Sequence, residues 1–215
     1  MSDQSLQIIL GSNSPRRREL LAGLGVTFSA ISIDADETYP AHLQAGDIPM
    51  YISRAKAHAY EPQLKENELL ITADTIVWCD GRMLGKPHNE AEAFDMIRLL
   101  SGKTHQVYTA VTFAQKSRQN SAISFQNSAI SRQTSDFSME TVVDKTDVTF
   151  AELSDEEIRF YVQQYKPFDK AGAYGIQEWI GYMGCTQLDG SYFNVMGFPT
   201  HLVYKELKKR GVNLK

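Results

Sequence analysis

The sequence contains little cysteine and no long apolar run. Cys79 and Cys185 are its two cysteines, and they lie far apart, with neither a Cys-x-x-Cys motif nor zinc-type spacing. No apolar stretch approaches the roughly 20 residues of a membrane-spanning helix, and the N-terminus has no cationic segment followed by an apolar one. These absences argue against a disulfide framework, a structural zinc site and a membrane anchor. The simplest expectation is a cytoplasmic protein with free thiols.

Several common nucleotide and metal motifs are also missing. Residues 101–104 (Ser-Gly-Lys-Thr) resemble the end of a P-loop, but Ile97 stands where that motif requires its first glycine. His88 and Glu90 match the start of a zinc-deaminase signature that lacks its Cys-x-x-Cys partner here. There is no Gly-x-Gly-x-x-Gly and no His-Glu-x-x-His. Function must therefore be sought in other residues.

Length and charge set the broad class. At 215 residues the chain is long enough for one well-buried domain, or for two small lobes that share a cleft. The formal net charge of −4 argues against binding to a nucleic-acid polymer. We expect a single domain over 1–215 whose ligands are small molecules.

Apolar periodicity predicts alternating strands and helices, and therefore an α/β fold with a mixed twisted sheet and flanking helices. Residues 115–140 are polar and rich in Ser, Gln and Asn, and they read as an insertion in a hairpin connection. The expected strands are residues 6–10, 27–33, 69–78, 107–113 and 141–150, and the expected helices are residues 14–24, 47–60, 89–100, 154–164 and 199–211.

Three consecutive arginines, Arg16, Arg17 and Arg18, fall in the first turn of an expected helix. Ser14 is a good N-cap and Pro15 is the preferred first helical residue. Cations are disfavoured at a helix N-terminus by the macrodipole, whereas exposed backbone N–H groups there favour an anion. One arginine would simply extend into solvent, but three in this position indicate an anion site, and we expect a polyphosphate to bind there.

Charged residues elsewhere are ambiguous when each is taken alone. Asp74 interrupts the apolar strand over residues 69–77, where a buried carboxylate needs a partner or a metal. As a strand-end residue it could equally cap a turn. Lys56, Lys86 and Glu37 would, singly, most often be solvated side chains.

Two segments rich in small and turn-forming residues could line a cleft. Residues 167–177 (Pro-Phe-Asp-Lys-Ala-Gly-Ala-Tyr-Gly-Ile-Gln) allow close approach of the backbone to a ligand. The amide of Gln177 offers both a donor and an acceptor for a base edge. Residues 190–199 lead into the last helix. Each segment could also be a purely structural turn.

Taken together, these motifs resemble those of the Maf family of nucleoside triphosphate pyrophosphatases. Residues 12–21 (Ser-Asn-Ser-Pro-Arg-Arg-Arg-Glu-Leu-Leu) are similar to the opening signature of the family. The other motifs follow in the family's order and cover nearly the whole chain apart from the polar insertion: residues 73–75 (Ala-Asp-Thr), 85–87 (Gly-Lys-Pro), 100–105 (Leu-Ser-Gly-Lys-Thr-His), 169–177 and 190–199.

The resemblance implies a two-lobed fold around a central cleft, similar to inosine triphosphatase (Maf/Ham1). It also implies hydrolysis of a nucleoside triphosphate to the monophosphate and pyrophosphate with a divalent cation, Mg²⁺ or Mn²⁺. Asp74 would be the proton acceptor, and Asp74 and Glu37 would hold the metal. Arg18 is left outside the site because it turns about 100° from Arg17 around the helix. The residues expected to bind the triphosphate or the base are Ser12, Arg16, Arg17, Lys56, Lys86, Thr75 and Gln177.

Three of these positions indicate the substrate. The branch of the family with Ser-Pro-Arg-Arg, Ala-Asp-Thr and Gly-Ile-Gln acts on dTTP, UTP and some modified pyrimidine triphosphates, and Arg16, Thr75 and Gln177 match it. The branch acting on 7-methyl-GTP differs at these positions. A 7-methyl-GTP enzyme and a non-catalytic nucleotide-binding regulator of septum formation remain as alternatives. Homodimers are common among similar proteins, and the sequence itself leaves the oligomeric state open.

Overall fold

The structure, a computed structural model, describes residues 6–116 and 137–212. A seven-stranded sheet forms its centre, with the order β2-β1-β3-β5-β6-β7, and β4 pairs with β3 outside this path. β2, β1 and β3 are parallel, and the remaining pairs are antiparallel. The strands are β1 (Gln7–Gly11), β2 (Phe28–Ile31), β3 (Glu68–Cys79), β4 (Arg82–Leu84), β5 (Thr104–Lys116), β6 (Phe137–Phe150) and β7 (Cys185–Asp189).

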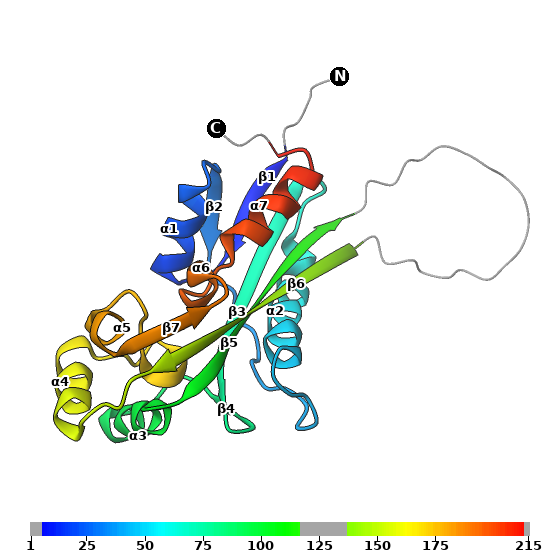
Figure 1. Cartoon of the computed structure of the whole chain (residues 1–215). Helices are drawn as coiled ribbons and strands as arrows, with labels where there is room; N and C mark the ends of the chain where they lie inside the picture. Colours follow the sequence, from blue (N-terminus) through cyan, green and yellow to red (C-terminus); the bar gives the residue numbers. More distant parts are fainter. Residues whose placement is uncertain (1–5, 117–136, 213–215) are drawn as a thin grey trace, which may run out of the picture.

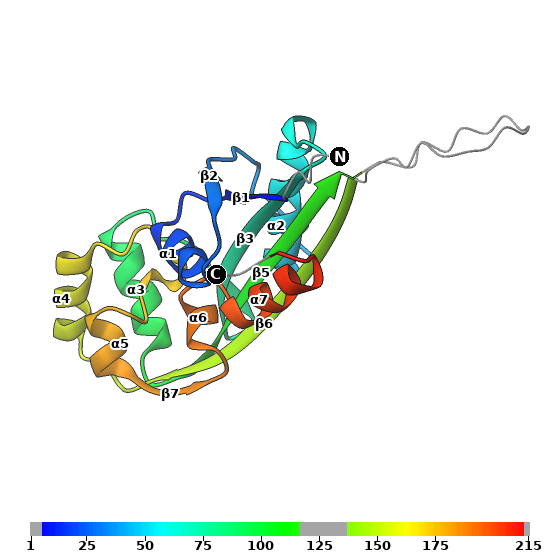
Figure 2. The same ribbon diagram turned by 90° about the horizontal axis from the view of Figure 1, so that it is seen from above.

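Helices cover both faces of this sheet (Figures 1 and 2). No helix in the described residues is long and apolar enough to cross a membrane. The helices are α1 (Pro15–Gly23), α2 (Asp47–Tyr60), α3 (Glu90–Leu100), α4 (Asp155–Tyr165), α5 (Trp179–Gly184), α6 (Tyr192–Val195) and α7 (Thr200–Lys209), with short 3₁₀ helices at Glu61–Gln63 and Ala171–Ala173. The expected mixed α/β architecture is confirmed.

Local sequence signals set several of these boundaries. Ser14 caps α1 by accepting a hydrogen bond from the backbone N–H of Arg17, and Gly25 follows the helix at φ +74°. Ser154 and Glu157 form a capping box at the start of α4. The Asp80-Gly81 turn between β3 and β4 has positive φ at both residues, as a tight hairpin turn requires.

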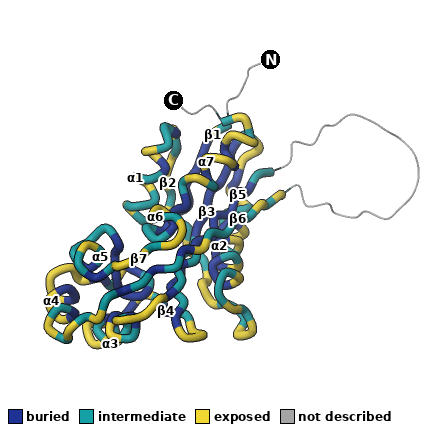
Figure 3. The backbone as a smooth tube through the Cα atoms, in the orientation of Figure 1, coloured by how far each residue is buried: buried dark blue, intermediate teal, exposed yellow. Residues whose placement is uncertain are grey.

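The side chains of β3 alternate between the two faces of the sheet, as in any strand. Leu70 packs in a cluster with Ala57 of α2, and Ile76 packs with Ile52 of the same helix. The odd-numbered residues of β3 face the other way, where α1 and α7 cover one end of the sheet and α3, α4 and α5 cover the other. The buried backbone follows the central strands in Figure 3. The core on this second face is therefore divided into two clusters.

The chain after residue 170 contains elements that the sequence pattern did not predict. α5, β7 and α6 have six, five and four residues, too few to produce a recognisable apolar period. The predicted hairpin connection joins β5 and β6, which pair antiparallel as far as Lys116 and Phe137. The remainder of the predicted insertion, residues 117–136, lies outside the described residues.

Candidate active site

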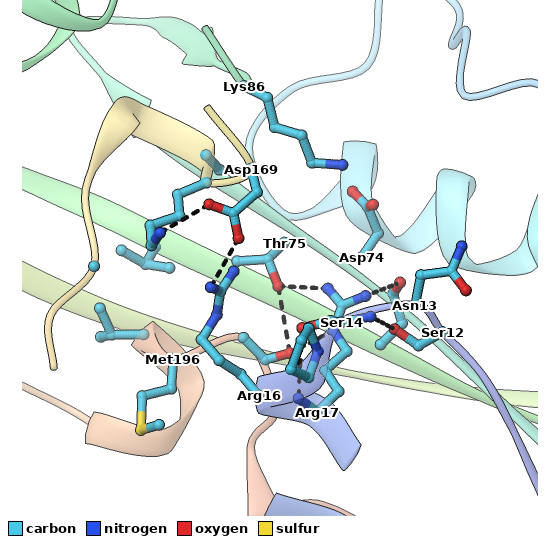
Figure 4. Close-up of a pocket in the computed structure, with 18 of the residues that line it drawn as sticks. Ser12, Asn13, Ser14, Arg16, Arg17, Asp74, Thr75, Lys86, Asp169 and Met196 are labelled. Carbon is cyan, nitrogen blue, oxygen red and sulfur yellow. Dashed lines mark hydrogen bonds and ion pairs between the residues drawn. The ribbon is translucent and has the colours of Figure 1, made fainter. Parts of the chain in front are cut away.

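One cavity of about 340 Å³ lies where α1, α2, β3 and the segment after residue 168 come together (Figure 4). Six separate stretches of the chain supply its charged and polar groups. All nine residues singled out in the sequence line this cavity: Ser12, Arg16, Arg17, Glu37, Lys56, Asp74, Thr75, Lys86 and Gln177. Arg18, which we expected outside the site, is not among the lining residues.

The cavity follows an interruption along one edge of β3. β1 pairs with β3 as far as Thr72, and β4 begins to pair at Val77. Within the described chain, residues 73–76 therefore have no strand partner on this edge, although β5 pairs with all four on the other. Asp74 points to the α2 face and Thr75 to the opposite face, and the open edge lets one cavity reach both.

On the α2 face, an ammonium group joins two carboxylates. Lys56 of α2 donates a hydrogen bond from Nζ to Asp74 Oδ1 at 2.8 Å and lies 2.9 Å from Glu37 Oε1. The side chains of Lys56 and Asp74 are each 13% exposed, whereas that of Glu37 is 51% exposed. Glu37 comes from the loop after β2, so the fold brings together three residues that looked independent in the sequence.

Burial and neighbouring charges act on these carboxylates in opposite directions. Burial raises the pKa of Asp74 above its ordinary value, with Lys56 and Arg17 opposing this effect. Partial burial also acts to raise the pKa of Glu37, but the hydrogen bond and charge of Lys56 and the charges of Lys86 and Arg17 hold it below its ordinary value. Glu37 is therefore the more firmly ionised of the two.

The two carboxylates fit a hard divalent cation. Asp74 Oδ1 lies 2.8 Å and Glu37 Oε1 lies 2.9 Å from Lys56 Nζ, so the two carboxylate oxygens are close to each other at the cavity wall. No group of three or more His, Cys, Asp or Glu residues suited to a metal occurs in the described part of the chain. Mg²⁺ is commonly held by one or two carboxylates together with substrate phosphates and water, and the donor set of Asp74 and Glu37 matches that requirement.

On the opposite face, Arg17 connects three parts of the chain. Its guanidinium donates to the carbonyl oxygen of Ala73 at 2.8 Å, to Thr75 Oγ1 at 3.0 Å and to the carbonyl oxygen of Gly197 at 2.9 Å. Burial lowers the pKa of Arg17, and the carboxylate of Asp74 opposes this. Arg17 therefore supplies the unpaired edge of β3 with a side-chain donor in place of a neighbouring strand.

The Thr75 hydroxyl is also engaged inside the protein. In addition to Arg17, it hydrogen-bonds to Thr109 Oγ1 of β5 at 3.0 Å. Gly197 has φ +102°, and a Cβ there would lie 3.3 Å from Thr75 Oγ1, so a side chain would crowd this contact. Thr75 thus shapes the cavity wall and fixes the guanidinium next to it.

Arg16 takes a different direction from Arg17. Its Nη1 lies 3.1 Å from Asp169 Oδ2 (Figure 4). Arg18 folds back and donates to the carbonyl oxygen of Ser12, at 3.2 Å from Nη2. The three consecutive arginines therefore have three different environments, which a helix produces by turning each about 100° from the last.

The remaining predicted residues leave polar groups available at the cavity. The Ser12 hydroxyl is nearly buried and accepts a hydrogen bond from the backbone N–H of Ser14 at 3.2 Å. Lys86 extends toward the space in front of Asp74 (Figure 4). Within the described residues, no hydrogen bond or ion pair occupies Lys86 Nζ or the Gln177 amide.

Asp169 and Lys170 are two site residues that the sequence did not predict. Both line the cavity, and Lys170 is 8% exposed although it is a lysine. A lysine is almost never so deeply buried without a partner, and Lys170 contacts both Asp169 and Glu178. The sequence carried a weak signal for this pair, since Asp169 and Lys170 open the glycine-rich segment that ends in Gln177.

The chain is similar to known proteins along nearly its whole length. Residues 7–210 match the family model described as Maf-like protein. The chain is 51% identical over 207 residues to a protein of Phocaeicola vulgatus named dTTP/UTP pyrophosphatase, covering 96% of this chain and 97% of that protein. A protein of Bacteroides thetaiotaomicron with the same name is 50% identical over 204 residues, covering 94% and 95%.

The fold also has a counterpart among solved structures. The Ham1 protein of Staphylococcus aureus superposes with a TM-score of 0.51 and 13% identity, over 95% of this chain and 99% of that protein. This likeness concerns the fold, and it agrees with the Maf/Ham1 architecture expected from the motifs. The extent of the family match and the identity to the two bacterial relatives show that the chain belongs to the Maf family.

Proposed function

We propose that the chain is a nucleoside triphosphate pyrophosphatase that hydrolyses dTTP and UTP to the monophosphate and pyrophosphate. Full-length relatives at about 50% identity carry this activity in their names. The observation that carries the proposal is the single cavity in which a buried carboxylate, several cations and an unoccupied amide meet. A protein that only bound a nucleotide would need the cations and the amide, but it would have no use for the buried carboxylate.

Hydrolysis at the α-phosphorus requires an activated water and stabilisation of the leaving pyrophosphate. We assign Asp74 as the proton acceptor, because its carboxylate faces the cavity and burial favours its neutral form. Arg16, Lys56 and Lys86 line the same cavity and supply positive charge to it. Lys56 keeps Asp74 in place through the 2.8 Å hydrogen bond and can neutralise phosphate charge as substrate approaches.

A divalent cation would be held by Glu37 and Asp74. When bound, Mg²⁺ or Mn²⁺ would neutralise triphosphate charge and polarise the phosphoryl oxygens. Glu37 is suited to this duty because its neighbours favour its ionised form.

We assign recognition of the pyrimidine to the opposite face of β3. The Gln177 amide has donor and acceptor groups available, which match the carbonyl and N–H groups on the edge of thymine or uracil. Thr75 shapes the wall of this part of the cavity, and Arg16 reaches across it toward Asp169.

Product analysis tests the proposal directly. The purified chain is incubated with Mg²⁺ or Mn²⁺ and dTTP, UTP, CTP, GTP or 7-methyl-GTP, and mono- and diphosphate products are separated. Release of dTMP and UMP with pyrophosphate is the expected result. Cleavage of 7-methyl-GTP instead would overturn the pyrimidine assignment while keeping the reaction type. Binding of dTTP without turnover of any triphosphate would favour the regulator.

A further inference from the structure

Asp169 lies in a row of alternating charges that connects α1 with both ends of the glycine-rich segment. Arg16 Nη1 lies 3.1 Å from Asp169 Oδ2, and Lys170 Nζ lies 2.8 Å from Asp169 Oδ1. Lys170 Nζ also lies 3.1 Å from Glu178 Oε1. Within the described chain, Asp169 is the hydrogen-bond partner of the Arg16 side chain. The direction of the Arg16 guanidinium therefore depends on where Asp169 stands.

The far end of this row is anchored in the protein core. The Tyr161 hydroxyl, on α4, donates to Glu178 and accepts a hydrogen bond from the backbone N–H of Gly175 at 3.0 Å. Tyr161 is fully buried. A Cβ on Gly175 would lie 2.8 Å from the carboxyl carbon of Glu178, so backbone and carboxylate are closely packed. The segment is thus held at a fixed place relative to α4.

The same segment carries Gln177 and contacts the loop that carries Lys86. Gln177 directly precedes Glu178, and the backbone N–H of Gly172 donates to the carbonyl oxygen of Gly85, next to Lys86, at 3.0 Å. One rigid loop therefore holds Gln177, borders Lys86 and orients Arg16.

We propose that Asp169 is a positioning residue for substrate selection: it fixes the Arg16 guanidinium relative to Gln177, so that the two act as one unit in recognising the pyrimidine nucleotide. The inference rests on the proposed function. Asp169 is 58% exposed, and its ion pairs within the described residues are with Arg16 and Lys170, so its loss leaves the Lys56–Asp74 pair in place. Without it, Arg16 is free to turn toward solvent and must be ordered again each time substrate binds.

The test compares Asp169→Asn, which removes the charge at constant volume, with Asp169→Glu, which restores it. A matched control is Asp80→Asn, because Asp80 is 55% exposed, pairs with Lys103 at 2.7 Å and lies outside the cavity. Steady-state kinetics with dTTP, UTP and CTP give KM and kcat separately. For Asp169→Asn we expect the KM for dTTP and UTP to rise roughly fivefold and kcat to change less than twofold. The ratio of kcat/KM for dTTP to kcat/KM for CTP should therefore decrease. Asp169→Glu should recover part of the preference, and Asp80→Asn should match the wild type.

A double variant shows whether Asp169 acts through Arg16. If it does, Asp169→Asn adds little to the effect of Arg16→Gln. Full additivity, a loss confined to kcat, or an unchanged preference in Asp169→Asn would overturn the proposal. Calorimetric binding of the α,β-imido analogue of dUTP tests the role of Asp169 without requiring hydrolysis, so its failure can be told apart from failure of the proposed function. If the wild type binds this analogue but hydrolyses no triphosphate, weaker binding by Asp169→Asn still supports the role of Asp169, and equal binding refutes it.

Discussion

Replacing Arg17 with lysine should cost substantial folding stability. The guanidinium donates to the Ala73 and Gly197 carbonyls and to the Thr75 hydroxyl, and these acceptors lie on different sides of it. A lysine ammonium is a single nitrogen on a flexible chain and cannot reproduce the planar fork. Lysine therefore retains one of the three hydrogen bonds at best and leaves two acceptors unpaired.

The magnitude follows from those two lost bonds. A hydrogen bond from a charged donor stabilises the folded state by about 1.5–3 kcal/mol, and leaving a buried acceptor unpaired costs a comparable free energy. Because the site borders an open cavity, water recovers part of this, and we expect Arg17→Lys to lower the free energy of unfolding by about 3 kcal/mol. Urea denaturation at fixed pH and ionic strength measures it as a lower transition midpoint.

Arg18→Lys is the matched control for this experiment. Arg18 is the next residue of the same helix, and its hydrogen bonds to the Ser12 carbonyl, at 3.2 and 3.4 Å, lie at an exposed side chain. Lysine and arginine have nearly equal helix propensity, so this variant should change stability by less than about 1 kcal/mol. If Arg17→Lys unfolds within about 0.5 kcal/mol of the wild type, the connecting role of Arg17 is refuted.

Three further outcomes are expected. Asp74→Asn should lower kcat at least about 1000-fold while keeping the urea midpoint close to the wild type, since it removes the proton acceptor at constant volume; substantial residual kcat would contradict its role. Chelation of divalent metal should abolish dTTP hydrolysis, and added Mg²⁺ or Mn²⁺ should restore it; activity that persists at saturating chelator would exclude the cation. Burial lowers the pKa of His105 from 6.5 to about 4, so the unfolded chain takes up the proton first. The contribution of His105 to stability should be complete above pH 6.5 and decrease by on the order of 2–3 kcal/mol toward pH 4, a dependence that urea titrations should find reduced in His105→Gln.

Features encoded by neighbouring residues could be predicted from the sequence. α1 begins and ends where Ser14, Pro15 and Gly25 indicate, because a cap, a fixed φ and a positive φ act within one or two turns. The need of Asp74 for a partner could also be predicted from its neighbours, because a carboxylate inside an apolar strand needs a partner wherever the strand lies.

The functional contacts of the arginines could not be predicted in this way. The partners of Arg17 lie 56 to 180 positions away, and Asp169 is 153 positions from Arg16. Two of the acceptors for Arg17 are backbone carbonyls, which every residue possesses, so no residue type could reveal them. The cluster pattern indicated an anion site, but only the fold shows that the three arginines have separate contacts.

Because one edge of β3 is open, neighbouring residues of this strand line the same cavity from opposite faces of the sheet, which a fully paired strand would prevent. Asp74 and Thr75 are adjacent in sequence, yet Asp74 hydrogen-bonds to α2 and Thr75 hydrogen-bonds to α1 and to the carbonyl oxygen of Gly197. Under the proposed function, substitutions at Gln177 or Arg16 change which base is accepted, while Lys56 keeps its contacts with both carboxylates. A single scaffold of this kind can diversify its substrates during evolution while it inherits one unchanged reaction centre.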